Sequence, residues 1–523
     1  MGYLLHIVLA LGALALAENG VRSGLQLPFT VVLLAFVPHA LAYFDRKLFV
    51  RGHFRIASAL YAALTWSPPA LFALALCGAG WGTTLTRWFG AAPNITGWPS
   101  PVVFAALVPY VGYTLLAIDA RVRVADSREH AIARARRFQT RMFFAGLAPL
   151  LLFLAVAWLI GTSATLRAHI EFVGLWGATF AALALAAAIG CLPWVLRNTW
   201  DTSAMPSGAT RELLERFADA AKFRCRELLV WNTGQQMANA AVVGVGANRR
   251  VVLFSDALLA QLPPRELLSV FAHEIGHVAR HHVLSFIAWA LALFIGLDVT
   301  LAKFVQGGEW VAYASLGGTL VVWYLGFGFL SRRAELEADL YSIELTGDLD
   351  GMIGALELVG SPHTRGITSW RHFSTEQRVE FLRSAALDPR IAQKLKTRMR
   401  RVAWIGVALA VIALGFELRE LVRALPVDRV TVELALGAND KAATALHALE
   451  QPDPDLARLV ECANSAPYES ASPEQLRQFA DEARKHNALV TAFDLYTLAR
   501  LRGVPELTDT LDELGPALRT ENR

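Results

Sequence analysis

The sequence has few cysteines and few charged residues for its length. It contains 4 cysteines in 523 residues, and no two of them form a CxxC pair. This excludes a disulfide framework and a thiolate zinc site. Charged residues make up 18% of the chain and the formal net charge is +4. That charge is too small and too scattered to indicate a nucleic-acid partner.

The chain is instead rich in apolar sequence, which makes up 54% of its residues. A membrane-spanning helix needs about 17 to 25 apolar residues. Six candidate runs precede residue 200 and three follow residue 283, which predicts a mainly α, polytopic membrane protein with about eight to nine transmembrane helices. The runs are 3–17, 27–45, 56–80, 100–118, 142–162, 172–196, 284–305, 310–330 and 402–417.

Two of these runs have alternative interpretations. The first is short and ends in small residues at Ala13–Ala17, which also fits a secretory signal cleaved after Ala17. The lack of a positive segment before it favours a retained span. The last run, 402–417, is also short, and its alternative is a buried helix of a soluble domain.

The basic residues predict which side of the membrane each loop faces. Lys and Arg concentrate at 46–55 and 121–141, whereas the loop at 81–99 has Arg87 as its only basic residue. Because cytoplasmic loops carry the excess of Lys and Arg, both basic loops should lie in the cytoplasm. By alternation, the segment after the sixth run should lie there too.

From residue 198 to about residue 280 the composition is that of a soluble domain. Three strands are expected at 227–231, 239–245 and 250–254, which would form a small mixed sheet. Pro263 and Pro264 then mark the start of a helix that is expected to run without interruption from Arg265 to His282.

That helix contains an HExxH motif at residues 273–277. Residues four apart share a helix face, so His273 and His277 can present two imidazoles to one metal ion while Glu274 reaches a water molecule. The motif alone is weak, because five positions with three fixed residues arise by accident in long chains.

A third ligand is expected after the hairpin formed by the runs at 284–305 and 310–330, because the chain then returns to the side of the HExxH helix. Zinc catalysis requires three protein ligands and one open position. Glu335 and Asp339 are four residues apart, so Glu335 can bind the metal while Asp339 orients a ligand from behind. Glu337 is the competing carboxylate, but it faces another side of the same helix.

These paired motifs resemble the integral-membrane zinc metallopeptidases of the CAAX prenyl protease type I and HtpX family. The resemblance covers roughly residues 205 to 385 and rests on HExxH, with His282 just beyond it, and on the Ser331–Asp339 segment. It implies a small α+β zincin-type (gluzincin) catalytic domain with one Zn²⁺ per chain. Its ligands would be His273, His277 and Glu335. Glu274 would be the catalytic base, and Asp339 would orient one of the ligands.

Two further positions carry roles implied by the same resemblance. Asn239 and Ala240 match the family's edge strand, which binds substrate by adding it to the sheet. The segment 371–378 resembles a His-Pro-x-x-x-x-Arg element, in which His372 would stabilise the tetrahedral intermediate. Phe373 stands where proline is usual, so this role of His372 depends on an imperfect match. His281 and His282 are not assigned to the metal.

The sequence thus predicts a membrane-embedded zinc endopeptidase that hydrolyses membrane-associated or misfolded proteins with a metal-activated water. The alternatives are a dedicated processing protease for a lipidated or signal-bearing substrate, and a non-proteolytic scaffold or transporter.

The expected partners are polypeptide substrates and the lipid bilayer, and the expected location is a bacterial inner membrane with the site facing the cytoplasm. The expected domains are 1–200 (membrane), 201–283 and 331–400 (catalytic), 284–330 (hairpin), 401–421 (last span) and 422–523 (helical).

Overall fold

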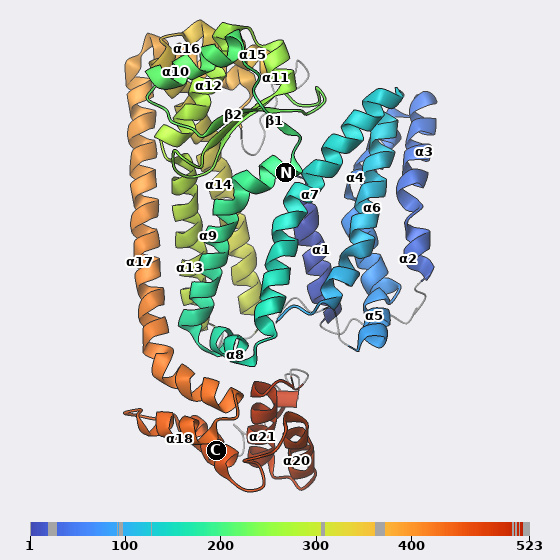
Figure 1. Ribbon diagram of the computed structural model, residues 1–523, viewed down its shortest axis with the longest axis vertical. Helices are drawn as coiled ribbons and strands as arrows, with labels where there is room; N and C mark the ends of the chain where they lie inside the picture. Colours follow the sequence, from blue (N-terminus) through green and yellow to red (C-terminus); the bar gives the residue numbers. More distant parts are fainter. Residues whose placement is uncertain are drawn as a thin grey trace. The chain divides into compact units, whose positions relative to one another are not determined.

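The computed structural model consists mainly of long helices with one small sheet (Figure 1). It describes residues 2–18, 29–90, 93, 98–126, 128–304, 309–360, 372–504 and a few positions between 507 and 515. The chain forms two compact units. One comprises Met1–Trp158 and Ala186–Leu414, and the other comprises Leu159–Leu185 and Gly415–Arg523.

Within the described residues, six helices or joined helices are long and apolar enough to cross a membrane, or seven if one bent pair is counted as a span. The predicted total of eight to nine spans is therefore not confirmed. The first run forms α1 (Gly2–Glu18), whose apolar part is shorter than a span. The six are Phe29–Val50 (α2, Phe29–Leu34, with α3, Val37–Val50), Phe54–Gly78 (α4, Phe54–Ala73, with a π-turn), α6 (Val102–Ala125), α7 (Glu129–Gly161), α9 (Gly174–Thr199) and α17 (Pro389–Ala435).

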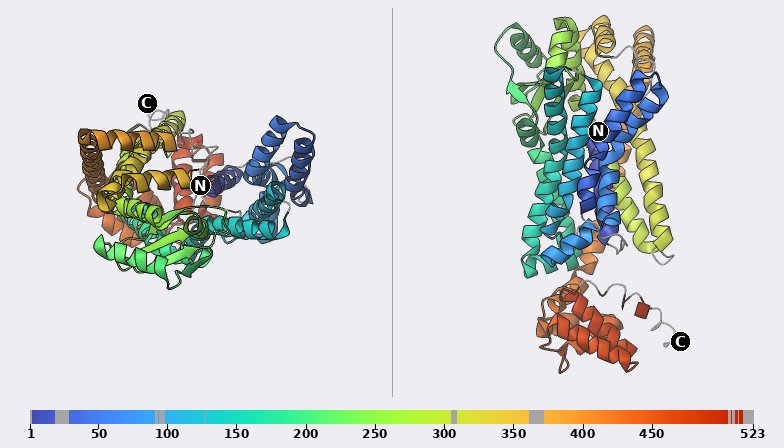
Figure 2. Two further views of the ribbon diagram at one scale, coloured as in Figure 1. Left: turned by 90° about the horizontal axis from the view of Figure 1, so that it is seen from above. Right: turned by 90° about the vertical axis from the view of Figure 1, so that its right-hand side faces the viewer.

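The N-terminal helices pack around one apolar core. The views in Figures 1 and 2 agree that α1, α4, α6 and α7 lie side by side. Phe72 of α4, Tyr110 of α6 and Phe143 of α7 are fully buried and meet at ring-centroid distances of 5.6 and 5.9 Å. The outward faces of these helices carry exposed leucine, valine and phenylalanine side chains, as expected where lipid is the solvent.

A four-stranded mixed sheet follows the helix α9. The strands β1 (Thr202–Ala204), β2 (Glu227–Trp231), β3 (Ala240–Val243) and β4 (Val251–Ser255) lie in the order β1-β2-β4-β3, so β3 is an edge strand. The three predicted strands are confirmed, and β1 was not predicted. Trp231 of β2 stacks on Trp200 at 4.1 Å and contacts Phe138 of α7. This contact attaches the sheet to the basic end of a membrane helix.

The helix that carries HExxH is α12 (Pro264–Ala279), and Pro263 is its N-cap. The predicted start is therefore correct. The prediction of an uninterrupted helix to His282 is wrong, because α12 ends at Ala279 and α13 (His282–Phe304) begins after a bend of 40°. His281 lies in this break with φ of +53°, a left-handed conformation that no α-helix contains.

The hairpin expected after this helix consists of α13 and α14 (Glu309–Thr346), which pack against each other. α14 continues past the apolar run into the domain that contains the sheet and packs along α12. The domain is completed by α10 (Ala209–Ala220), α11 (Asp256–Gln261), α15 (Leu349–Val359), α16 (Thr375–Leu387) and the first turns of α17.

The last apolar run, 402–417, belongs to α17, a single helix of 47 residues. Only 11% of the apolar part of this helix is buried. The alternative of a buried helix is therefore wrong, because a helix buried in a domain core would not leave Trp404, Ile405 and Val411 more than half exposed.

The second unit is helical. α8 (Ala164–Phe172) packs on the end of α17 through Ala168, Val173 and Val432, and Gly174 N–H donates to the Asp428 carboxylate at 3.0 Å. Four further helices share one apolar core that includes Leu476, Leu495 and Tyr496. They are α18 (Asn439–His447), α19 (Pro454–Asn464), α20 (Pro473–Lys485) and α21 (Leu489–Leu501).

Candidate active site

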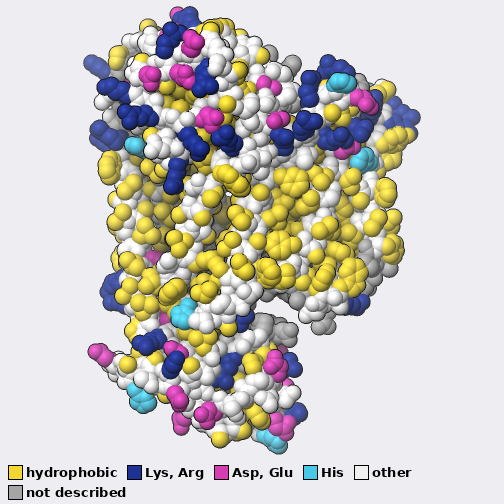
Figure 3. Space-filling view, in the orientation of Figure 1, with side chains coloured by type: hydrophobic (Ala, Val, Ile, Leu, Met, Phe, Trp, Pro, Cys, Tyr) yellow, Lys and Arg dark blue, Asp and Glu magenta, His cyan; other side chains and the backbone are white. Residues whose placement is uncertain are grey.

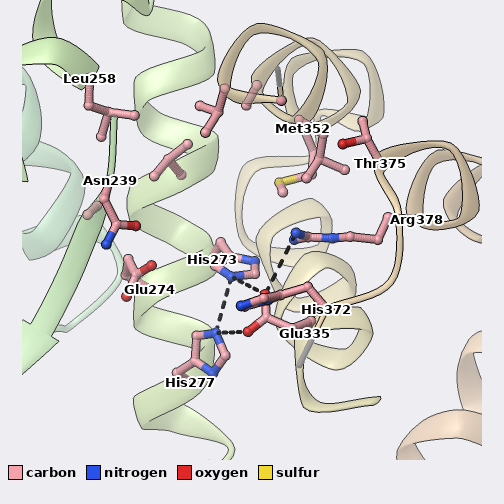
Figure 4. Close-up of a pocket in the computed structure, with 16 residues that line it drawn as sticks. Asn239, Leu258, His273, Glu274, His277, Glu335, Met352, His372, Thr375 and Arg378 are labelled. Carbon is pink, nitrogen blue, oxygen red and sulfur yellow. Dashed lines mark hydrogen bonds and ion pairs between the residues drawn. The ribbon is translucent and has the colours of Figure 1, made fainter. Parts of the chain in front are cut away.

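α12 presents His273 and His277 on the face that looks across a cavity toward α14 and α16 (Figure 4). The helix forms because its apolar residues, among them Leu267, Phe271 and Ile275, recur at helical spacing and pack on the sheet. This packing fixes the rotation of the helix about its axis. The two histidines therefore lie on the side that faces away from the sheet.

Glu335 reaches the same point from α14 because the two helices approach closely. A Cβ added to Gly276 would lie 3.2 Å from Cα of Ala338 and 3.1 Å from Cβ of Tyr341. The contact therefore requires glycine on one helix and a small residue on the other. Ser342 Oγ also donates to the carbonyl of Ser269 at 2.7 Å, which fixes the register of α14 against α12.

The three predicted metal ligands converge. The Nε2 atoms of His273 and His277 are 3.1 Å apart, and each lies 3.7 Å from a carboxylate oxygen of Glu335. One ligand atom from each of the three residues lies within 4.8 Å of the others. Ligands about 2.0 to 2.2 Å from a tetrahedral zinc ion are separated by roughly 3.3 to 3.6 Å. The donor set and its spacing therefore fit zinc.

Asp339 fixes the proton position on His273. Its carboxylate is fully buried and lies 2.8 Å from Nδ1 of His273. Since an ionised carboxylate only accepts hydrogen bonds, Nδ1 must donate, and this leaves the Nε2 lone pair free for a metal. Arg378 donates to both oxygens of Asp339, at 2.8 and 2.6 Å. Burial acts against ionisation of Asp339, but the Arg378 charge outweighs it and lowers the pKa of Asp339.

A second chain of hydrogen bonds lies behind His277. Its Nδ1 is 2.9 Å from Nδ1 of His282, and Nε2 of His282 is 3.1 Å from the Glu337 carboxylate. Both His282 and Glu337 are buried. If His282 donates from Nε2 to Glu337, its Nδ1 must accept from Nδ1–H of His277. His277 then also has a free Nε2 lone pair, so the two facing Nε2 atoms carry no proton between them and both are available to a metal.

Glu274 lies on the other side of α12, next to Asn239 and the edge strand (Figure 4). Its carboxylate accepts a hydrogen bond from the backbone N–H of Val242. Burial raises the pKa of Glu274 to about 7, and the negative charge of Glu335 acts in the same direction. A carboxyl group with a pKa near neutrality can both accept and release a proton at physiological pH.

His372 lies near Glu335, although the match of its segment to the family element is imperfect. Its Nδ1 is 3.3 Å from Oε2 of Glu335, and its side chain is 48% exposed. Ser374 and Gln377 form a capping box that starts α16 and places Arg378 in its first turn. Burial acts against ionisation of Glu335, but the His372 hydrogen bond and the neighbouring positive charges lower the pKa of Glu335.

The site opens into a cavity of about 290 Å³. Asn239 and Ala240 line one wall, and the Asn239 side chain is exposed there. Asn239 C=O accepts a hydrogen bond from the N–H of Ser255 in β4. Every second residue of an antiparallel strand bonds to its partner, so the backbone groups of Ala241 and Val243 also face β4. The backbone groups of Ala240 and Val242 therefore point away from the sheet. The opposite wall is apolar and comprises Met352, Ala355, Leu356 and Val359.

The structure thus brings together the predicted His273, Glu274, His277, Glu335, Asp339 and His372, with Asn239 and Ala240 on the same cavity. Sequence reasoning gave no role to Arg378, Glu337 or His282. Arg378 lies six residues after His372, in the very segment that resembled the family element, and that spacing was the signal. Glu337 does face another side of α14, as predicted. Its contact with His282 depends on the break after α12, which the sequence reasoning missed.

Residues 206–386 match the sequence model of peptidase family M48. The chain is 37% identical over 95 residues to a CAAX prenyl protease 1 homolog of Oryza sativa subsp. japonica, covering 17% of this chain and 22% of that protein. It is 28% identical over 203 residues to a CAAX prenyl protease 1 homolog of Arabidopsis thaliana (34% and 48%). It is 33% identical over 144 residues to Protease HtpX of Pseudomonas syringae pv. tomato (24% and 47%).

Each of these alignments spans less than half of the relative. The crystal structure of S. mikatae Ste24p aligns over 67% of this chain and 98% of its own at 13% identity, and a TM-score of 0.38 makes this a distant likeness that adds no support. The domain match and the two groups of relatives agree with the motifs. The chain is an integral membrane protein whose residues 206–386 match peptidase family M48, and it is similar in sequence to CAAX prenyl protease 1 homologues and to HtpX.

Proposed function

We propose that this protein is a zinc-dependent endopeptidase that cleaves membrane-associated or misfolded polypeptides. The observation that carries the proposal is the convergence of His273, His277 and Glu335 at a cavity that Glu274 also lines. Three converging nitrogen and oxygen donors beside a carboxyl base are the set of groups that metal-assisted peptide hydrolysis requires.

His273, His277 and Glu335 would hold the metal. When bound there, zinc supplies Lewis acidity that polarises the scissile carbonyl and favours deprotonation of water. Asp339 and His282 keep the two imidazoles in the tautomer that leaves Nε2 free, as their hydrogen bonds of 2.8 and 2.9 Å indicate.

Glu274 is the proposed general base and acid. Its carboxylate removes a proton from the attacking water, and the same proton then passes to the leaving amine nitrogen. Attack of the water forms the new C–O bond first, and the C–N bond of the substrate breaks once the leaving nitrogen has received that proton. The raised pKa of Glu274, about 7, suits both the uptake and the release of a proton near neutral pH.

The edge strand is the proposed substrate track. An extended peptide would pair with the outward backbone groups of Ala240, because the N–H of Val242 is already bonded to Glu274. Asn239 lies at the end of the same strand and would bond to the next peptide unit. The apolar wall with Met352 and Leu356 favours an apolar substrate side chain beside the cleaved bond.

His372 is the proposed donor to the developing oxyanion. Its side chain is half exposed at the cavity, so it can reach a substrate oxygen without a change of fold. The Arg378 guanidinium, 3.7 Å from Glu335, adds positive charge to the same side.

We further propose that the site lies on the cytoplasmic face of a bacterial inner membrane. Phe138, which lies among the basic residues before the apolar part of α7, contacts Trp231 of the sheet. Because Lys and Arg mark the cytoplasmic side, the domain would lie there, and substrates would arrive from the cytoplasm or along the bilayer.

The test compares the wild-type protein with the Glu274→Gln variant. We expect the variant to retain its zinc, measured by elemental analysis, because the base is not a ligand. It should lose at least about a hundredfold in cleavage rate, as general-base removal does. Membrane-protein fragments should appear in cells with the wild type and be absent with the variant.

Fragments from one protein only would favour a dedicated processing protease over general proteolysis. A Glu274→Gln variant that binds zinc and performs the cellular function unchanged would contradict the peptidase proposal and support a scaffold or transporter.

A further inference from the structure

A second and larger cavity lies behind the site, between the end of α12, the start of α13 and α17. Its volume is about 670 Å³, and it shares no lining residue with the substrate cavity. This size is within the range of sites for small molecules and cofactors, about 300 to 1,000 Å³. His282 and Glu337, which orient His277, belong to its lining.

The lining is divided into a basic part and an apolar part. Arg280, Lys396 and Arg400 form the basic part. Leu284, Trp404 and the neighbouring apolar residues of α17 form the other, one turn or more farther along each helix. With a rise of about 1.5 Å per residue, basic Lys396 and apolar Trp404 lie roughly 12 Å apart along α17.

This division coincides with the predicted membrane boundary. Five basic residues of α17 lie between Lys394 and Arg401, and no charged residue follows until Glu417. Along α13, no charged residue occurs between Val283 and Leu297. Figure 3 shows Lys and Arg side chains gathered above a hydrophobic band over these helices. Trp404 is 68% exposed at the junction, where tryptophan is enriched in membrane proteins.

The charge of the cavity is not balanced by the protein. Arg280 and Lys396 both form ion pairs with Glu344, and Arg280 lies 4.0 Å from Glu337. Among the residues that the structure describes, Arg400 has no acidic partner. A ligand that satisfies both parts of the lining must carry a negative charge at one end and an apolar chain at the other.

We propose that this cavity binds an anionic phospholipid of the bilayer. Its phosphate lies between Arg400 and Lys396, and the upper part of an acyl chain lies against Leu284 and Trp404. Basic pockets between membrane helices on the cytoplasmic side are suited to such headgroups. Free phosphate would leave the apolar wall uncovered, and a neutral lipid would leave Arg400 without a partner.

The test measures lipid binding to the purified full-length protein by native mass spectrometry, after removal of bound lipid with detergent. The probes are phosphatidylglycerol, phosphatidylcholine and inorganic phosphate. Arg400→Gln is the test variant. Arg401→Gln is the matched control, because Arg401 is the next residue of the same helix, is also exposed, and does not line the cavity. Zinc content, measured in parallel, reports that each variant is folded.

We expect the wild type and Arg401→Gln to bind phosphatidylglycerol equally and in preference to phosphatidylcholine. Arg400→Gln should weaken binding about fivefold, the effect of one basic residue near a lipid surface, with zinc content unchanged. An equal loss in both variants would show attraction to general surface charge and overturn the proposal. Equal binding of the two lipids, or competition by inorganic phosphate at the concentration of the lipid, would also overturn it. None of these readouts depends on peptidase activity.

Discussion

Nδ1 of His282 lies 2.9 Å from Nδ1 of His277, although the two residues are five apart and an unbroken helix would place them on different faces. The break at Arg280 and His281 makes this contact possible, because it turns the start of α13 back toward α12. His282 in turn contacts Glu337. The carboxylates that support the two histidines, Asp339 and Glu337, thus both come from α14, the helix that supplies Glu335.

Replacement of His282 by alanine should weaken zinc binding, since His277 would lose the group that fixes its tautomer. We expect a loss of about 10- to 100-fold in affinity, as for other residues that hold a metal ligand, measured by competition with a chelator. His281→Asn is the control, because His281 is exposed and asparagine tolerates its positive φ. Unchanged zinc affinity in His282→Ala would refute the role of this residue.

Replacement of Arg378 by methionine should destabilise the catalytic domain, because it leaves the Asp339 carboxylate buried without its partner. Breaking a buried ion pair in this way costs about 3 to 5 kcal/mol. Adding Asp339→Asn should restore part of the thermal stability, since the buried Asp339 charge is then removed, while zinc affinity stays low. If the double variant is as unstable as Arg378→Met, the destabilisation has another cause.

Replacement of Gly276 by alanine should push α12 away from α14, because the added Cβ would lie 3.2 Å from a backbone atom of Ala338. We expect a loss of about 1 to 3 kcal/mol in stability from overpacking, together with weaker zinc binding as Glu335 moves away from the histidines. Gly326→Ala on α14 is the control, since a Cβ there meets no atom within 4 Å. The measurements are the unfolding temperature and the zinc content, and equal values for the two variants would contradict the prediction.

The ion pair between Arg265 and Asp348 should make stability depend on pH in the acid range. The hydrogen bond from Arg265 lowers the pKa of Asp348, so the contribution of this pair is fully present above the unfolded pKa of about 3.9. It is lost as the pH falls through the lower folded value. Asp348→Asn keeps the N-cap of α15 but removes the charge.

At neutral pH this variant should unfold a few degrees below the wild type, and the difference should shrink below about pH 4. Arg265→Gln should behave in the same way, because it removes the other half of the pair. A difference that stays constant down to pH 3, measured by thermal unfolding of either variant, would exclude the ion pair as its source.

Much of the site could be predicted from the sequence because its residues are spaced along regular helices. The four-residue intervals from His273 to His277 and from Glu335 to Asp339 place side chains on one face of any α-helix. Likewise, alternation and turn residues predicted three strands, and apolar runs predicted the membrane helices. The number of spans could not be predicted in this way, since the apolar part of α1 is shorter than a membrane span.

The residue types, the helix faces and the order of the two motifs follow from the sequence alone. Which side chains meet depends on the tertiary structure. The close approach at Gly276 sets the separation of α12 and α14, and Arg378 reaches Asp339 from α16. The break after Ala279 brings His282 to His277 and Glu337 to His282. These contacts depend on packing between segments far apart in the chain, and local periodicity carries no information on them.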